Sequence, residues 1–481
     1  MRPTDVSAWV TISDPRVAPG GARVAYTEQC VDLGANRYVT TVWVTELDGT
    51  RRPAIADETG TPTNTSMARW SPDGRTLALL RTPRTDDSDA PTSIVVVPVA
   101  DDHGDVDDDA NSITVVCTPP EAPSELEWSP DGTRLAFVAR DPDRAYYAAP
   151  GETLAARDVP ARRITHLFTR EDGEGFTFDR PSRVFVVAAT ADATPHVRSD
   201  GAGASGMTWS PDGTRLAYCE ARHDDWDLDL ANDIWIVAAD ATAALEPRRL
   251  TEPGRSWSAP AWSPDGRFIA AICHPTPLDE PRHGRLVVID AGSGESLATT
   301  ADIDRNCSPY PSPGAPCWES RASLLFALED AGAVPLMRVT VLDVTSGRCE
   351  LAPVVDGTRT VTGFDARDHT LAVLIGDATS LPELHVASSR SADLVAITDA
   401  TARFRDASGA EPVAPIRFDA VSTGGATVEG WAFRPAGDGP FPTLLNIHGG
   451  PFTQYGYRLF DEFQMQVRAG FAVVCCNPRG S

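Results

Sequence analysis

Short apolar segments separated by a recurring polar turn dominate residues 1–410. The sequence Trp-Ser-Pro-Asp-Gly occurs four times, beginning at Trp70, Trp128, Trp209 and Trp262, and each copy leads into a short apolar segment such as Thr76 to Leu79. Proline presets φ for the second position of a type I turn, aspartate tolerates the third, and glycine accepts a positive φ. The pattern therefore predicts a β-hairpin at each copy, and we interpret the motif as a turn with no further role.

Weaker copies of the same pattern extend the series in both directions. The positions equivalent to the tryptophan are 17, 70, 128, 209, 262, 318 and 364. A third strand follows in at least two units, at residues 93–97 and 233–237. Repeated units of short strands at this spacing are typical of a β-propeller. We expect a seven-bladed propeller over residues 1–410, with a degenerate eighth blade left open.

The interval between Trp128 and Trp209 is longer than the others and contains an insertion. We expect an elaborated hairpin there, overhanging one face of the propeller. Acidic residues gather in two places, residues 101–109 and residues 224–229. Because neither stretch has the ligand spacing of an EF-hand, we expect solvated loops, with calcium binding as the weaker alternative.

The pattern changes after about residue 410. A predicted hairpin (421–433) and a proline-glycine linker (435–442) lead to an apolar strand (443–447). A glycine-rich turn, a helix (459–469) and a second apolar strand (471–476) follow. This order is typical of the opening of an α/β sheet, in which strands are buried on both faces. We therefore expect a second domain over residues 411–481.

Composition narrows the possible classes of partner. All 42 basic residues are arginines and 68 residues are acidic, so the formal net charge is −26. Nucleic acids and anionic membranes both require a positive surface, so we expect neither as a partner. The start of the chain carries no signal-like apolar stretch, and no 18-residue apolar run is present. The nine cysteines are scattered without a Cys-x-x-Cys pair, which favours small buried residues in the cytoplasm and gives no support for a metal or cofactor.

The turn His448-Gly449-Gly450 follows the first apolar strand of the second domain. Backbone N–H groups of such a turn can form an oxyanion hole, which binds the negative charge of a tetrahedral intermediate. A glycine turn that only allows a close backbone approach is an equally good interpretation of this motif by itself.

The whole chain resembles the prolyl oligopeptidase family of serine peptidases, most closely its acylaminoacyl-peptidase-like branch. The resemblance rests on the Trp-Ser-Pro-Asp-Gly repeats and four further stretches: residues 172–176, residues 224–228, residues 448–452 and residues 477–481. It implies a propeller that caps an α/β-hydrolase domain and limits access to peptide substrates of small size. It also implies that Gly449 and Gly450 form the oxyanion turn, with the Gly450 N–H as the preferred donor.

The same resemblance assigns roles to the neighbouring residues. His448 would position the turn and would not be the catalytic histidine, and with Pro451 and Arg479 it would form part of the active-site wall. Ser481 would lie in the loop that shapes this wall and would not be the nucleophile. Other branches of the family carry a tyrosine at the His448 position and use its hydroxyl group, which this chain lacks.

The nucleophile elbow Gly-x-Ser-x-Gly is absent from the 481 residues. In α/β-hydrolases the triad follows in the order Ser, Asp, His, and a complete domain needs roughly 200 residues. We therefore expect the truncated start of an α/β-hydrolase domain with none of the triad present, inactive by itself. The alternatives are a non-catalytic propeller that binds a partner and carries a vestigial hydrolase tail, and another hydrolase chemistry such as that of an esterase.

Overall fold

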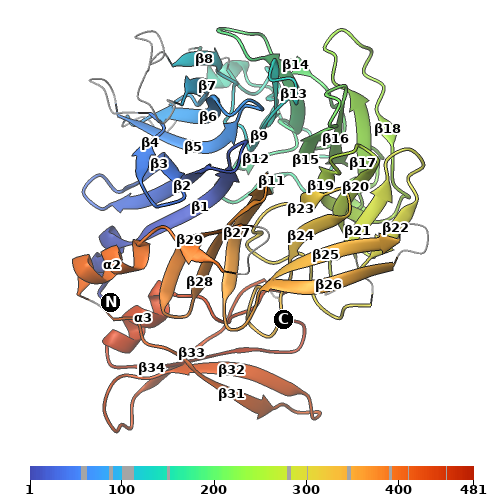
Figure 1. Cartoon of the computed structure of the whole chain (residues 1–481). Helices are drawn as coiled ribbons and strands as arrows, with labels where there is room; N and C mark the ends of the chain where they lie inside the picture. Colours follow the sequence, from blue (N-terminus) through green and yellow to red (C-terminus); the bar gives the residue numbers. More distant parts are fainter. Residues whose placement is uncertain are drawn as a thin grey trace.

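The computed structural model is built mainly of β-sheets (Figure 1). It describes the chain except for residues 56–61, 86–89, 100–112, 149–151, 279–282, 301, 344–347, 389–392, 410 and 451. The acidic stretch 101–109 therefore lies outside the described residues. Within them, seven four-stranded antiparallel sheets follow one another along the chain.

The bounds of the strands follow the repeats. The first sheet holds β1 (Val10–Val17), β2 (Arg23–Asp32), β3 (Arg37–Glu46) and β4 (Arg51–Pro53). The second holds β5 (Thr63–Trp70), β6 (Thr76–Pro83), β7 (Ser93–Pro98) and β8 (Thr114–Cys117). The third holds β9 (Glu125–Trp128), β10 (Arg134–Arg140), β13 (Ser182–Ala188) and β14 (His196–Val197). The fourth holds β15 (Ser205–Trp209), β16 (Arg215–Glu220), β17 (Asp233–Ala238) and β18 (Arg248–Arg249).

The remaining three sheets also contain four strands each. The fifth holds β19 (Ser256–Trp262), β20 (Phe268–His274), β21 (Arg285–Asp290) and β22 (Ser296–Thr299). The sixth holds β23 (Cys317–Ser320), β24 (Ser323–Ala327), β25 (Leu336–Asp343) and β26 (Arg348–Val355). The seventh holds β27 (Thr360–Arg367), β28 (Thr370–Asp377), β29 (Ser380–Ser388) and β30 (Val395–Ala396).

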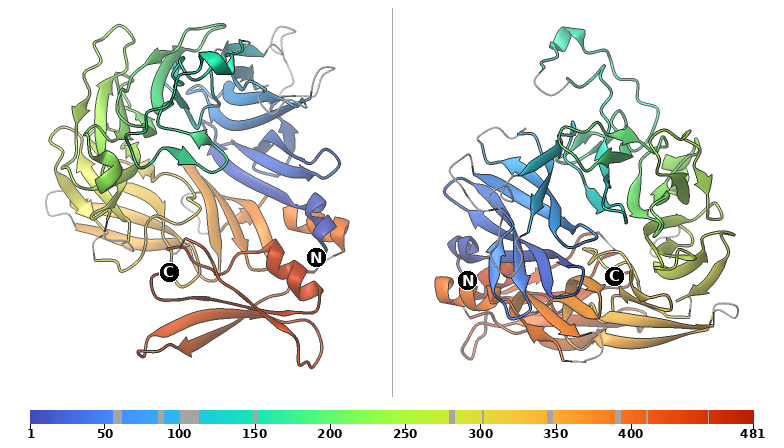
Figure 2. Two further views of the ribbon diagram at one scale, coloured as in Figure 1. Left: turned by 180° about the vertical axis from the view of Figure 1, so that it is seen from behind. Right: turned by 45° about the horizontal axis from the view of Figure 1, so that its top comes forward.

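Each sheet packs its apolar face against the next one. Six clusters of buried side chains join successive sheets, from the first and second to the sixth and seventh. A further cluster joins the first sheet to the seventh, through residues such as Val24 and Leu374. The backbone N–H of Val17 also donates to Asp365 Oδ2 at 2.7 Å across this joint. The sheets are accordingly set side by side around a common centre (Figures 1 and 2).

The four Trp-Ser-Pro-Asp-Gly motifs form turns between paired strands, as predicted. In the first copy, Gly74 has φ 71° and donates its N–H to Ser71 O at 2.9 Å. The tryptophans do more than the sequence indicates. The indole N–H of Trp70 donates to Arg16 O (3.0 Å) and that of Trp128 to Arg69 O (2.9 Å), and each acceptor lies on the preceding sheet. In these two copies the motif therefore also ties neighbouring sheets together, whereas the indole N–H groups of Trp209 and Trp262 are buried without an acceptor among the described residues.

Two short helices flank the joint between the first and seventh sheets, η1 (Pro3–Ala8) and α2 (Ala400–Ser408). Phe404 of α2 packs edge-on against Trp9, with ring centroids 5.6 Å apart. Arg403 forms an ion pair with Glu28 of β2 at 3.1 Å. In the part of the chain that the structure describes, no helix combines the length and apolar character needed to cross a membrane.

The insertion lies between β10 and β13. It contains η2 (Ala156–Asp158) and a two-stranded hairpin, β11 (Arg170–Glu171) and β12 (Gly175–Phe176). The predicted hairpin is thus present, and the segment that carries η2 projects away from the sheets (Figure 2, right).

The last sheet belongs to residues 416–477. Its strand order is β31 (Ile416–Val421), β32 (Thr427–Phe433), β34 (Ala472–Asn477) and β33 (Thr443–Asn446). The strands β33 and β34 are parallel, and α3 (Asp461–Arg468) lies between them in the chain. Phe463 and Val467 of α3 pack with Trp431 and Val473 of the sheet. The predicted hairpin, helix and strands are therefore confirmed.

The strand at 443–447 has the apolar composition of a strand buried on both faces, but one of its faces is exposed in this structure. Leu445 is 61% exposed and Ile447 is 77% exposed. The exposed positions 443, 445 and 447 alternate with half-buried ones, so they share one face of the strand, and that face is open to solvent here. The prediction for the second strand fits better, since Val473 and Cys475 of β34 are buried.

Candidate functional site

The loop after β33 carries the His-Gly-Gly turn and faces the sixth and seventh sheets. A cavity of about 310 Å³ lies between the two parts. Tyr310, Thr360 and Thr362 line it from the ring of sheets. His448, Gly449 and Arg458 line it from the loop. A pocket of this size, between two structural units and with a few polar groups, is typical of a ligand site.

A tight contact between two glycines fixes the loop against the ring. Gly456 packs directly on Gly332, which precedes β25, and a Cβ at Gly456 would overlap the carbonyl group of Gly332. Next to it, the Tyr457 N–H donates to Gly332 O at 2.8 Å and Thr360 Oγ1 donates to Tyr457 O at 2.8 Å. Trp431 packs edge-on against the Tyr457 ring. These contacts hold the loop and the seventh sheet together as the two walls of the cavity.

Asn477, at the end of β34, holds the other side of the loop. Its Oδ1 accepts a hydrogen bond from Tyr455 N at 2.8 Å, and its Nδ2 donates to Tyr455 O at 2.9 Å. The Tyr455 ring in turn packs edge-on against the imidazole of His448, with centroids 5.3 Å apart. The loop is thus positioned from both the ring and the final sheet.

His448 is hydrogen-bonded through both ring nitrogens. Its Nδ1 lies 3.0 Å from Gly449 O, and because a carbonyl can only accept, Nδ1 carries the proton. The Nε2 atom then accepts from the Ser481 hydroxyl at 2.9 Å. A serine that donates to an imidazole is the first half of a nucleophile–base pair, but the second half requires a carboxylate on the other nitrogen. Here that nitrogen bonds to a backbone carbonyl.

The remaining predicted site residues are accessible to solvent. Gly449 and Gly450 are exposed, and Gly450 has φ 123°, a conformation that favours glycine. Arg479 is also exposed, and Pro451 lies outside the described residues. The structure therefore brings His448 and Gly449 to the cavity, and the roles predicted for His448, Gly449, Gly450, Pro451 and Arg479 all stay predictions.

Several residues of the site were not predicted from the sequence. Gln454, Tyr457 and Arg458 carry no recognisable motif, and Gln454 Oε1 accepts from Gly332 N, a partner 122 positions away. Asn477 belongs to the stretch 477–481 that carries the resemblance, but the sequence predicts no role for its side chain. A local pattern cannot reveal such contacts, although the two glycines at 449 and 456 on either side of Gln454 mark a loop that approaches other backbone closely.

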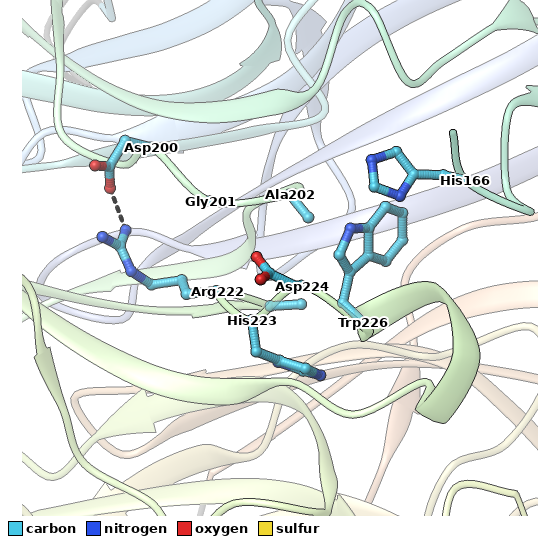
Figure 3. Close-up of a pocket in the computed structure, with 9 residues that line it drawn as sticks. His166, Asp200, Gly201, Ala202, Arg222, His223, Asp224 and Trp226 are labelled. Atoms are coloured by element: carbon cyan, nitrogen blue, oxygen red, sulfur yellow. Dashed lines mark hydrogen bonds and ion pairs between the residues drawn. The ribbon is translucent and has the colours of Figure 1, made fainter. Parts of the chain in front are cut away.

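A second and larger cavity, of about 490 Å³, lies where the insertion meets α1 (Trp226–Asp229) (Figure 3). His166 packs against Trp226, with ring centroids 5.6 Å apart, and Arg222 forms an ion pair with Asp200. No serine, threonine or cysteine is among the described residues that line it, so it offers no hydroxyl or thiol nucleophile.

The acidic stretch beside this cavity is not simply a solvated loop. Asp227 is only 7% exposed, and its Oδ2 accepts from the backbone N–H of Leu167 in the insertion at 2.5 Å. The expectation of a solvated loop is therefore wrong for Asp227, because the carboxylate holds the insertion against α1. Among the described residues no group of three or more His, Cys, Asp or Glu side chains is placed to bind a metal ion.

Comparison with known proteins supports a peptidase fold. No family model matches the chain. The uncharacterized peptidase YuxL of Bacillus subtilis is 23% identical over 507 aligned residues, covering 99% of this chain and 70% of that protein. The acylaminoacyl peptidase of Pyrococcus horikoshii superposes with a TM-score of 0.74 at 22% identity, covering 99% of this chain and 66% of that one. This chain therefore spans about two thirds of the length of that peptidase.

Two further solved structures are similar to this chain. The β-propeller domain of the Trilobed protease from Pyrococcus furiosus superposes with a TM-score of 0.53 at 19% identity, covering 81% of this chain and 96% of that one. An acylaminoacyl peptidase solved with Z-Gly-Gly-Phe-chloromethyl ketone superposes with a TM-score of 0.74 at 22% identity, covering 99% of this chain and 66% of that one. The relatives and structural neighbours are thus peptidases of the acylaminoacyl-peptidase and prolyl oligopeptidase kind, and they confirm the resemblance found in the sequence. They do not favour a non-catalytic binding module.

Proposed function

We propose that this chain provides the propeller and the first part of the catalytic domain of a serine peptidase of the prolyl oligopeptidase family, which hydrolyses short peptides by acyl transfer. The observation that carries the proposal is the cavity between the His448-Gly449 turn and the seventh sheet. A peptide bound there would lie between an oxyanion turn and the ring of sheets. A cytoplasmic location belongs to the same proposal.

The proposal includes a closed seven-bladed propeller over residues 1–410 that limits access to the site. Two observations support it: the succession of seven four-stranded sheets within the described residues, and the apolar cluster that joins the first sheet to the seventh. Oligopeptides would reach the cavity, whereas folded proteins would be excluded by size. The α/β-hydrolase domain would then begin at about residue 411.

The proposed chemistry assigns the residues of the loop to binding and positioning. The N–H groups of Gly449 and Gly450 would donate to the oxyanion, with Gly450 preferred. His448 would position this turn, since its Nδ1 binds Gly449 O. Arg479 and Pro451 would form the neighbouring wall. The nucleophile, the base and the orienting carboxylate are not among the assigned residues, because the 481 residues contain no Gly-x-Ser-x-Gly elbow.

A labelling experiment with a matched variant tests this proposal. The 481-residue chain and the product of the complete coding sequence are incubated with a fluorophosphonate probe and with a peptide arylamide. We expect labelling and hydrolysis only where a Gly-x-Ser-x-Gly elbow is present. Labelling of the 481-residue chain that is lost in Ser481→Ala would identify Ser481 as the nucleophile, and the proposal would be wrong.

A further inference from the structure

The cavity beside the His-Gly-Gly turn has an unusual charge for this protein. The chain carries a net charge of −26, yet no aspartate or glutamate is among the described residues that line the cavity. Arg458 is the only arginine in the lining, and the other lining residues apart from His448 are uncharged. The site therefore presents one fixed positive charge in a protein whose surface is strongly acidic.

Arg458 lies over an aromatic ring and has no ion-pair partner among the described residues. It lies in the chain between Tyr457 and the start of α3, and its guanidinium lies 6.0 Å from the centroid of the Phe460 ring. No carboxylate among the described residues lies within ion-pair distance of it, although Asp461 acts on it electrostatically from further away. Burial lowers the pKa of Arg458 below its usual value, because the surrounding protein atoms remove part of its hydration. An arginine remains charged even so.

An anionic ligand can supply the ion-pair partner that Arg458 lacks among the described residues. A charged group that has lost part of its hydration gains from a partner that accepts hydrogen bonds. Guanidinium binds carboxylates in a bidentate manner with fixed geometry, so arginine suits this role better than a point charge. Arg458 lines the cavity and is exposed to solvent, so a ligand can reach it.

We propose that Arg458 binds a carboxylate group of the peptide substrate and so selects short anionic peptides. This inference rests on the proposed function, because it places the ligand in the same cavity. The carboxylate belongs either to the C-terminus of the peptide or to an acidic side chain. Arg458 lines this cavity of about 310 Å³, so the carboxylate of a peptide bound there can contact it.

Equilibrium binding to the 481-residue chain tests the inference without hydrolysis. Three probes are titrated by calorimetry: acetyl-Ala-Ala-Phe as the free acid, the same peptide as the C-terminal amide, and the amidated peptide acetyl-Ala-Glu-Phe. We expect the free acid to bind at least about tenfold more tightly than its amide, which is the effect of one charge-assisted hydrogen-bond pair. Tighter binding of the glutamate peptide than of the uncharged amide would identify a side-chain carboxylate as the source.

Two variants show whether Arg458 is responsible. Arg458→Gln should abolish the preference for the carboxylate, and Arg458→Lys should restore part of it because the positive charge remains. Thermal unfolding of both variants controls for misfolding. Equal affinities for the acid and both amides, a preference that persists in Arg458→Gln, or no binding of any probe at millimolar concentration would overturn the inference.

The outcome separates this inference from the proposed function. If the chain prefers carboxylate ligands but the complete gene product has no serine that reacts with the fluorophosphonate, the anion site stands and the proposed peptidase function is refuted. If the protein hydrolyses the acid and the amide substrates at equal rates, the peptidase function stands and the anion site is refuted.

Discussion

Replacing Gly456 by alanine should open the wall between the loop and the ring. A Cβ at this position would overlap the Gly332 carbonyl, and backbone atoms on both sides leave no side-chain rotation that could relieve the clash. The loop must move, and three hydrogen bonds are then lost: Tyr457 N to Gly332 O, Thr360 Oγ1 to Tyr457 O, and Gly332 N to Gln454 Oε1.

The expected magnitude follows from these bonds. Each contributes about 1 kcal/mol, so the free energy of local opening should fall by about 3 kcal/mol. Since every 1.4 kcal/mol corresponds to a tenfold change in an equilibrium constant, amide exchange of residues 454–458 should accelerate roughly 100-fold. Hydrogen–deuterium exchange followed by mass spectrometry measures this segment directly.

A matched glycine in the same loop provides the control. A Cβ added at Gly449 meets no atom within 4 Å, so Gly449→Ala should leave the exchange of residues 454–458 unchanged. If Gly456→Ala exchanges at the wild-type rate, the contact between the two glycines does not hold the loop, and the cavity wall has another origin.

Three further perturbations test the ring and the insertion. Burial raises the pKa of Glu127 to about 7 from a usual value of 4.5. The folded chain therefore holds this proton more tightly than the unfolded chain does. The resulting contribution to the free energy of unfolding is complete below pH 4.5 and is lost as pH rises to 7. Glu127→Gln should therefore flatten this part of the stability–pH curve and stabilise the chain above pH 7 by up to about 3 kcal/mol in denaturant unfolding. Trp128→Phe removes the indole bond to Arg69 O and should cost about 1 to 2 kcal/mol. Asp227→Ala releases the Leu167 N–H and should make the insertion a site of limited proteolysis.

Each of these has an internal comparison. For Glu127→Gln, the difference from wild type should vanish below pH 4.5, and a constant difference would contradict the titration. Trp209→Phe makes the same change where the indole N–H is buried without an acceptor among the described residues, so a cost equal to that of Trp128→Phe would mean that the hydrogen bond is not responsible. Asp225→Ala alters an exposed carboxylate on the same turn, and equal cleavage in both variants would refute the role of Asp227.

Sequence reasoning was accurate wherever a short segment determines its own conformation. The hairpins at Trp70, Trp128, Trp209 and Trp262 follow from proline, aspartate and glycine within five residues, and α3 follows from the spacing of Phe463 and Val467. It could not fix the exposure of Leu445 residue by residue, because the apolar content of a strand does not show which of its faces is covered. It also failed for Asp227, whose burial depends on an insertion about 60 positions earlier in the chain.

The sequence by itself therefore determined the repeated sheets, the following strand–turn–helix–strand unit and the resemblance to serine peptidases. These features depend on local turn chemistry and on the spacing of apolar residues and repeated motifs along the chain. The tertiary structure decided where the site lies. The packing of Gly456 on Gly332 and the placement of Arg458 in an otherwise uncharged cavity join residues more than 100 positions apart. Such contacts arise from the packing of whole sheets against each other, and no property of either segment alone records them.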